Sequence, residues 1–186
     1  MNIMIVGVGG QGTLLASRIL GKVAIKEGYD VKVSEVHGMS QRGGRVVTYV
    51  KYGDKVYSPI IDRGEADLIL AFEMLEAMRA LPYLKKGGKM IANTQKMNPM
   101  PVITGAMEYP ENIEEKLSAK INLQAVDALS LAEKAGTIKA VNVVLIGLLA
   151  KSMDVDKNVW IDVIKETVPE KFLDVNIKAF ELGYEL

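Results

Sequence analysis

Residues 1–20, MNIMIVGVGGQGTLLASRIL, contain the turn that decides the fold. The apolar run 3–6 is typical of a strand buried on both faces, and the apolar spacing over 11–27 is typical of a helix. A strand that enters a helix through GxGxxG leaves backbone N–H groups and the positive end of the helix dipole facing one crevice. The turn therefore predicts an anion site, although such glycines can also serve tight geometry and helix packing alone. The candidate residues are Gly7, Gly9, Gly10, Gln11 and Gly12.

The composition predicts a single domain over residues 1–186 that can bury a core, since 49% of the residues are hydrophobic and 25% are charged. Basic and acidic residues number 23 each, so no overall field attracts nucleic acid or anionic lipid. The chain has no cysteine and cannot itself supply a thiolate nucleophile or iron–sulfur ligands. No signal-peptide pattern follows Met1, and the apolar stretch 143–150 is shorter than the roughly 20 residues of a membrane helix. We therefore expect a cytoplasmic protein without nucleic-acid or membrane partners.

Strand and helix signals alternate along the rest of the chain. A β-hairpin is expected where residues 46–51 and 55–57 flank Tyr52-Gly53-Asp54, in place of the second helix of a dinucleotide fold. A buried strand is expected at 66–71 and further strands at 31–36, 89–93 and 121–126. Helices are expected from Glu73 to near Pro82 and at 111–119, 129–135, 138–151, 157–167 and 170–184. The pattern predicts an α/β fold: a three-layer Rossmann-like domain whose mostly parallel sheet carries a β-hairpin insertion, followed by a helical C-terminal region.

A second glycine-rich segment follows the second predicted strand. Arg42 and Arg45 flank two glycines, so the backbone can approach a ligand while the guanidinium groups offer paired donors to phosphate or carboxylate. If both strands are parallel, both glycine segments lie at the same edge of the sheet and face one crevice. The alternative is a solvated turn whose arginines pair with surface carboxylates. The candidate residues are His37, Gly38, Met39, Ser40, Gln41, Arg42, Gly43, Gly44 and Arg45.

Three further residues have two interpretations each. Glu35 stands at the distance from the glycines expected of a ribose-binding acid, but a glutamate at a strand end is often only solvated. His37 is the only histidine and could act as an acid or base, or could anchor its loop. Asn142 could reach the crevice or satisfy a contact in the core. Because no catalytic triad or metal-ligand spacing occurs, no catalytic residue and no metal site are predicted.

Four segments, in order, resemble the gamma-type domain of the 2-oxoacid:ferredoxin oxidoreductases: GVGGQGTLLASRILG, SEVHGMSQRGGRVVTYV, ADLILAFEMLEAMRALPYL and KAVNVVLIGLLA. The sequence VHGMSQRGG is far more specific than GxGxxG, and the resemblance is strongest to the small beta subunits of the indolepyruvate type. It implies a cluster-free subunit, inactive alone, that supports oxidative decarboxylation of an arylpyruvate to an acyl-CoA. Thiamine diphosphate and the iron–sulfur clusters would lie on a large alpha subunit, which passes electrons to ferredoxin.

The resemblance also implies a place for the ligands. Both glycine-rich segments would lie at the subunit junction, with coenzyme A or the cofactor edge of the partner as their ligand and no cofactor bound by this chain alone. A ribose-binding role for Glu35 loses weight, since these enzymes do not use nicotinamide. Three alternatives remain open: the gamma subunit of a pyruvate or 2-oxoglutarate enzyme, a stand-alone module that binds NAD or a flavin, and a scaffold whose glycine loops only fit a neighbouring subunit.

Overall fold

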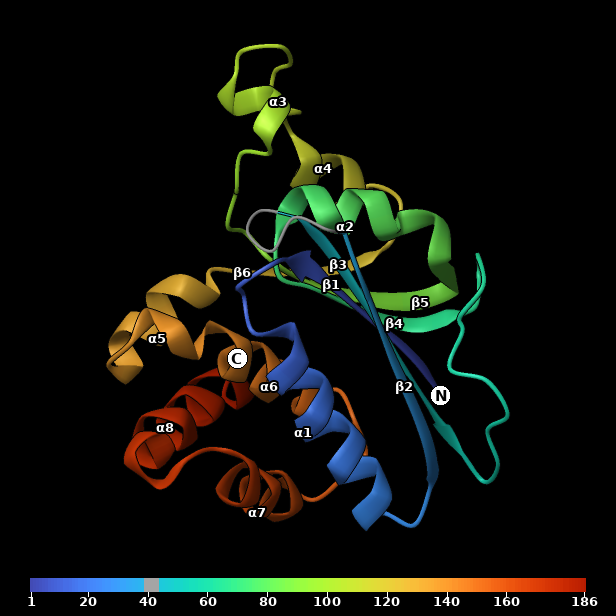
Figure 1. Ribbon diagram of the computed structural model, residues 1–186, viewed down its shortest axis with the longest axis vertical. Coiled ribbons are helices and arrows are strands. Elements are labelled where there is room, and N and C mark those ends of the chain that lie inside the picture. Colours follow the sequence, from blue (N-terminus) through green and yellow to red (C-terminus); the bar gives the residue numbers. More distant parts are fainter. Residues whose placement is uncertain (39–43) are drawn as a thin grey trace.

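A computed structural model describes residues 1–38 and 44–186, and a sheet of six strands forms its centre (Figure 1). The strands lie in the order β2-β3-β1-β4-β5-β6. Their bounds are β1 (Asn2–Val8), β2 (Asp30–His37), β3 (Arg45–Gly53), β4 (Ala66–Ala71), β5 (Leu84–Asn93) and β6 (Asn122–Val126). β1, β4, β5 and β6 pair in parallel, whereas β3 is antiparallel to both of its neighbours. The predicted α/β class is therefore confirmed.

Helices cover both faces of the sheet (Figure 1). One face carries α1 (Thr13–Lys26), α5 (Ala128–Ala135), α6 (Val141–Lys151), α7 (Lys157–Thr167) and α8 (Leu173–Tyr184). The other carries α2 (Met74–Ala80) and α4 (Ile113–Ser118), while α3 (Met100–Ile103) projects from the body. Short 3₁₀ turns are η1 (Leu81–Tyr83), η2 (Ile138–Ala140) and η3 (Glu170–Phe172). Within the described residues, no helix has the length and apolar character that crossing a bilayer requires.

The core forms on both faces of β1. Ile3 and Ile5 belong to the hydrophobic cluster under α1 and α6, and Met4 and Val6 belong to the cluster under α2. All four side chains are fully buried. Successive side chains of a strand point to opposite faces, so an unbroken apolar run is what a strand covered on both sides requires. The prediction of a doubly buried first strand is confirmed.

The predicted hairpin of residues 46–51 and 55–57 is wrong, because the second of these segments is not a strand. Residues 55–57 form no strand, and the N–H of Val56 instead donates to Asp30 Oδ2 at 2.9 Å. The hairpin is made by β2 and β3, and β3 enters the sheet between β2 and β1. β1 and β2 still run in the same direction, so their carboxyl ends share one edge of the sheet. There the N–H of Gly9 donates to the carbonyl of Gly44 at 2.9 Å.

Two glycines let α6 and α8 pack unusually close together. A Cβ atom at Gly147 would overlap the carbonyl oxygen of Phe180, and one at Gly183 would overlap that of Val144. All residues of α6 except Lys151 are buried, which confirms the predicted core helix. The C-terminal layer is therefore fixed to the sheet through a helix pair that has no room for a side chain at its crossing.

We expect Gly183→Ala to lower the free energy of unfolding by roughly 1–3 kcal/mol, because the added methyl group must push two helix backbones apart. Urea unfolding followed by circular dichroism measures the change. Gly21→Ala in α1 is the matched control, since its Cβ would meet Val33 Cγ2 at an ordinary 3.6 Å. That variant should be neutral or stabilising by up to about 1 kcal/mol. Equal losses in both variants would contradict the close-packing explanation.

Candidate functional site

The turn between β1 and α1 has a backbone that glycine adopts readily and other residues rarely adopt. Gly10 and Gly12 have φ angles of +99° and +83°. Gly12 caps α1 without a side chain, and the first helix amide with a partner is that of Ala16, which donates to Gly12 O at 3.2 Å. Among the described residues, the N–H groups of Gly10, Gly12 and Thr13 find no acceptor. Unpaired donors at the positive end of a helix form an anion-binding site.

Gln11 and Gly7 support this turn on the side that faces the end of β4. Gln11 Oε1 accepts from the N–H of Val8 at 2.8 Å, and its Nε2 donates to the carbonyl of Phe72 at 3.1 Å. A Cβ at Gly7 would lie 2.9 Å from Gln11 Oε1 and 3.0 Å from Phe72 Cβ. The Gln11 amide therefore joins the ends of β1 and β4, and these two predicted site residues support the turn.

Asn142 supports the same turn from α6. Its side chain is 4% exposed, and its Nδ2 donates to the carbonyl of Gly12 at 3.3 Å. A Cβ at Gly12 would approach that Nδ2 to 2.5 Å, so the helix packs directly on the glycine. The sequence left open whether Asn142 reaches the crevice or satisfies a contact in the core, and the structure shows that it contacts the glycine turn.

A cavity of about 330 Å³ lies between the turn and the end of β2. It brings the glycines together with Glu35 and His37, as the sequence predicts from two strands that end at one edge. Glu35 Oε2 accepts from the hydroxyl of Thr48 at 3.1 Å, and His37 Nδ1 lies 3.2 Å from the carbonyl of Gly38. The lining residues are Gly9, Gly10, Gly12, Thr13, Leu14, Glu35, His37 and Val46.

A second cavity, of about 480 Å³, lies on the other side of the turn, and a lysine is among the residues that line it. Lys139 supplies a cation there, whereas Glu35 places a carboxylate in the first cavity. Sequence reasoning missed Lys139 and Gln95 because both reach the turn from distant parts of the chain, without a local spacing signal. The lining residues are Gly9, Gly10, Gln11, Gly12, Gln95, Met97, Leu129, Ile138, Lys139 and Val141.

Arg45 lies on the opposite face of the sheet from these cavities. Side chains alternate along β3, so Val46 lines the first cavity while Arg45 points toward α2. Its Nε lies 3.1 Å from Glu76 Oε2, without hydrogen-bond geometry, and Arg79 Nη1 lies 2.5 Å from Glu76 Oε1. Arg45 thus pairs with a carboxylate that is 2% exposed, and the structure does not bring its guanidinium group beside the glycine turn.

The rest of the second glycine-rich segment divides into two groups. Gly38 is exposed beside Arg45 in a shallow hollow on the α2 face, and Gly44 accepts the hydrogen bond from Gly9. The remaining predicted site residues lie outside the described part of the chain: Met39, Ser40, Gln41, Arg42 and Gly43.

Glu73 is a buried acid that sequence reasoning read only as part of a helix. It stands at the carboxyl end of β4, is 1% exposed and caps α2 by accepting from the N–H of Glu76 at 3.0 Å. Its Oε1 also accepts from the N–H of Met97 at 3.1 Å and from the hydroxyl of Tyr109 at 2.5 Å. Burial and this hydrogen bond raise the pKa of Tyr109. Glu73 therefore fixes two points of the segment between β5 and α4.

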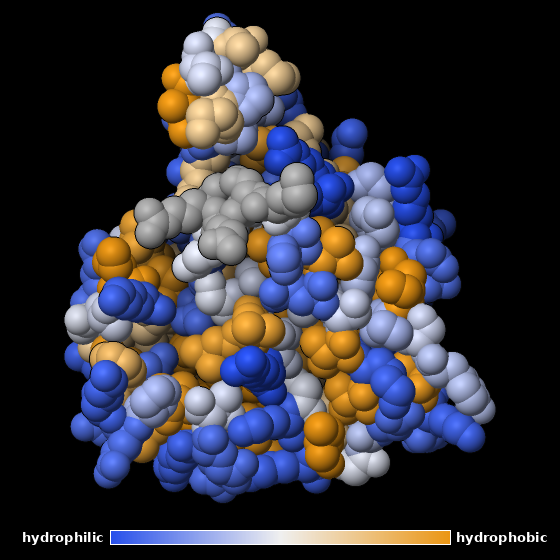
Figure 2. Space-filling model, in the orientation of Figure 1, coloured by the Kyte–Doolittle hydropathy of each residue, from blue (hydrophilic) through white to orange (hydrophobic). Residues whose placement is uncertain are grey.

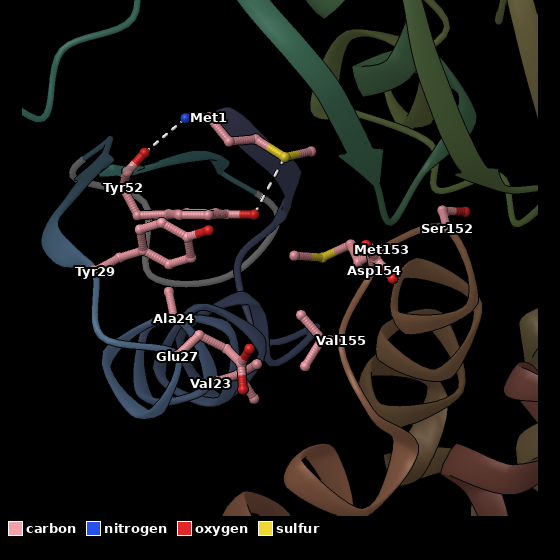
Figure 3. Close-up of a pocket in the computed structure, with 10 residues that line it drawn as sticks. All are labelled: Met1, Val23, Ala24, Glu27, Tyr29, Tyr52, Ser152, Met153, Asp154 and Val155. Carbon is pink, nitrogen blue, oxygen red and sulfur yellow. Dashed lines mark hydrogen bonds between the residues drawn. The ribbon is translucent and has the colours of Figure 1, made fainter. Parts of the chain in front are cut away.

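Another cavity, of about 300 Å³, lies at the amino end of β1, remote from the turn (Figure 3). The amino group of Met1 donates to the carbonyl of Tyr52 at 2.6 Å, and the Tyr52 hydroxyl donates to Met1 Sδ at 3.1 Å. The rings of Tyr29 and Tyr52 pack at a centroid distance of 5.3 Å. Burial raises the pKa of Tyr52 to about 12.

The raised pKa of Tyr52 predicts alkaline sensitivity. Unfolding exposes the phenol, which then ionises near its ordinary value of 10.0, while the folded state keeps its proton until about 12. The contribution of Tyr52 to the free energy of unfolding should therefore be constant below pH 10 and be lost as the pH rises through this window. Tyr52→Phe should reduce that fall in urea titrations between pH 8 and about 11. An identical fall in wild type and variant would sink the assignment.

The left-handed turn predicts unequal costs for two similar substitutions. Gly10→Ala should cost about 1–2 kcal/mol through backbone strain alone, since nothing lies within 4 Å of its Cβ. Gly12→Ala should cost about 2–4 kcal/mol, because it also collides with Asn142. Adding Asn142→Ala to Gly12→Ala should relieve the collision, so that urea denaturation shows a cost smaller than the sum of the single variants. Strict additivity would exclude the contact.

The chain is similar to known proteins over its whole length. The family model described as pyruvate ferredoxin/flavodoxin oxidoreductase matches residues 2–186. Indolepyruvate oxidoreductase subunit IorB of Thermococcus kodakarensis is 45% identical over 190 residues, which cover 98% of this chain and 93% of the relative. The solved gamma subunit of a keto/oxoacid ferredoxin oxidoreductase from Geobacter sulfurreducens has a TM-score of 0.73 and 25% identity, covering 99% of this chain and 96% of that chain.

A longer enzyme contains the same fold. The 2-oxoglutarate:ferredoxin oxidoreductase from Magnetococcus marinus, solved with 2-oxoglutarate, coenzyme A and succinyl-CoA bound, matches with a TM-score of 0.77 and 18% identity. The match covers 100% of this chain and 30% of that one. The comparisons confirm the predicted family and the predicted likeness to small subunits of the indolepyruvate type. The chain belongs to the pyruvate ferredoxin/flavodoxin oxidoreductase family.

Proposed function

We propose that this chain is the small subunit of an indolepyruvate:ferredoxin oxidoreductase and that its glycine turn holds the phosphates of coenzyme A at the junction with a larger subunit. The relative from Thermococcus kodakarensis supports the substrate class, and the bound coenzyme A in the Magnetococcus marinus enzyme supports the ligand. The observation that carries the site is the set of unpaired amides at the start of α1, open to a cavity on either side.

The charges around the turn give the proposed ligand an orientation. The amides of Gly10, Gly12 and Thr13 offer hydrogen bonds that need no reorganisation, because the positive φ angles of Gly10 and Gly12 fix the backbone of the turn. Lys139 attracts phosphate into the larger cavity, whereas the carboxylate of Glu35 repels it from the smaller one. The phosphates therefore lie over the turn, toward Lys139.

The larger subunit supplies what this chain lacks. Because none of the 186 residues is cysteine, thiolate ligands for iron–sulfur clusters must come from another chain. We place thiamine diphosphate and these clusters on the large alpha subunit, with ferredoxin as the acceptor of its electrons. Coenzyme A supplies the thiol that carries the acyl group away, and this chain contributes binding and orientation. The cytoplasmic location stays a prediction.

Lys139→Ala should raise the apparent KM for coenzyme A roughly threefold to tenfold with little change in kcat, because it removes a charge that acts on the bound phosphates. The assay is indolepyruvate-dependent and coenzyme A-dependent reduction of a viologen dye by the assembled enzyme under anaerobic conditions. Lys134→Ala is the matched control, an exposed lysine of α5 outside the cavity lining. An unchanged KM in Lys139→Ala would remove the phosphate role.

The double variant Arg42→Ala and Arg45→Ala tests the second glycine-rich segment in the same assay. It should also raise the KM for coenzyme A if the segment takes part in binding, and the single Arg45→Ala variant separates the effect of the ion pair with Glu76. Competition among indolepyruvate, pyruvate and 2-oxoglutarate assigns the 2-oxoacid. Tight binding of NADH or FMN to the isolated chain would instead favour a stand-alone nucleotide-binding module.

A further inference from the structure

Residues 94–112, hereafter the arm, leave the body of the protein between β5 and α4 and carry α3 at their tip (Figure 1). No residue of α3 is buried. Met100, Ile103 and Met107 expose 68%, 65% and 65% of their surface. In the space-filling view the projecting tip presents apolar and weakly polar surface beyond the rest of the molecule (Figure 2). Exposed apolar groups gathered on one projection indicate a binding surface.

The tip is also free of charge. Residues 98–107, NPMPVITGAM, contain no charged side chain, although 25% of the whole chain is charged. Met100 and Ile103 lie three residues apart on one side of the helical turn. Methionine side chains are flexible and polarisable, so they adapt to the shape of an apolar partner. An apolar, uncharged surface is therefore complementary to this tip.

The tip of the arm forms its own backbone hydrogen bonds, and the base of the arm is bonded to the body. The N–H of Met107 donates to the carbonyl of Pro101 at 3.0 Å, and the N–H of Thr104 donates to that of Met100 at 2.9 Å. At its base, Glu73 accepts from both Met97 and Tyr109. These hydrogen bonds restrain the tip and the base of the arm, and such restraint lowers the entropy lost when a partner binds.

The position of the arm indicates which partner it meets. Met97, near the base of the arm, lines the same cavity as the glycine turn and Lys139, so a subunit that covers this cavity lies within reach of the arm. Two copies of the tip packed on each other would bury only a few side chains each, whereas a stable interface buries about 800 Å² per partner. A larger subunit that covers both the cavity and the tip satisfies that requirement, and a second copy of this chain held by the tip alone does not.

We propose that the arm is a docking element whose uncharged tip inserts into an apolar pocket of the larger subunit of the same oxidoreductase. The inference rests on the proposed function, which supplies that subunit, and adds the element by which the two chains recognise each other. The arm binds the partner, while the glycine turn binds the ligand between them.

The test compares the wild-type chain with the triple variant Met100→Ser, Ile103→Ser and Met107→Ser. Biolayer interferometry measures the affinity of each for the purified larger subunit, and size-exclusion chromatography with light scattering measures the oligomeric state of each chain alone. We expect the triple variant to bind roughly tenfold more weakly or worse, with an unchanged melting temperature, because the three side chains contribute nothing to the core. The control is Ile25→Ser, Tyr57→Ser and Phe172→Ser, which removes 61%, 85% and 48% exposed side chains elsewhere and should bind as wild type does.

Each contrary outcome has its own meaning. If the triple variant binds the larger subunit as tightly as wild type does, the docking role is wrong and the proposed function stands. If the wild-type chain does not bind that subunit at all, the proposed function fails and the docking role fails with it. If the isolated chain is a dimer that the triple variant dissociates, the arm joins two copies of this chain and the inference is overturned.

Discussion

The side-chain amide of Gln11 is the interaction on which the functional edge of the molecule depends. It accepts from Val8 and donates to Phe72, so one residue closes the glycine turn and ties together the ends of β1 and β4. With these strand ends joined, α1 begins at a fixed place and its unpaired amides point in a fixed direction. Asn142 completes the support by contacting Gly12 from α6. The turn is thus braced from the sheet on one side and from the core helix on the other.

Because β3 lies between β1 and β2, its alternating side chains contribute to both faces of the sheet at this edge. Val46 and Glu35 face α1 and the glycine turn, whereas Arg45 faces α2 and its buried Glu76. The first face offers amides, a lysine and a carboxylate around an open turn. The second face contains Glu73, which caps α2, Glu76 within α2, and the base of the arm. Met97 connects the two regions, since it lines the larger cavity beside the turn and its N–H donates to Glu73 at the base of the arm.

Local patterns in the sequence predict the strands and the turn because both depend on neighbours in the chain. The run Ile3 to Val6 specifies a strand buried on both faces, and GxGxxG specifies the backbone of the turn. The sequence misplaces the hairpin because Tyr52-Gly53-Asp54 is a strong turn signal. The strand that forms the hairpin with β3 is β2, which precedes it across the second glycine-rich segment. Lys139 and Glu73 could not be assigned, since their roles come from tertiary contacts that leave no spacing pattern.

The attachment of the arm to Glu73 has an evolutionary consequence. The carboxylate of Glu73 accepts hydrogen bonds from Met97 at the start of the arm and from Tyr109 near its end. The chain between these two residues is therefore a loop attached at one point beside the sheet. The loop lies outside the paired residues of β5 and β6 and outside the glycine turn. Changes of sequence can therefore accumulate between these two anchor points without altering how the strands pair or how the glycine turn is built.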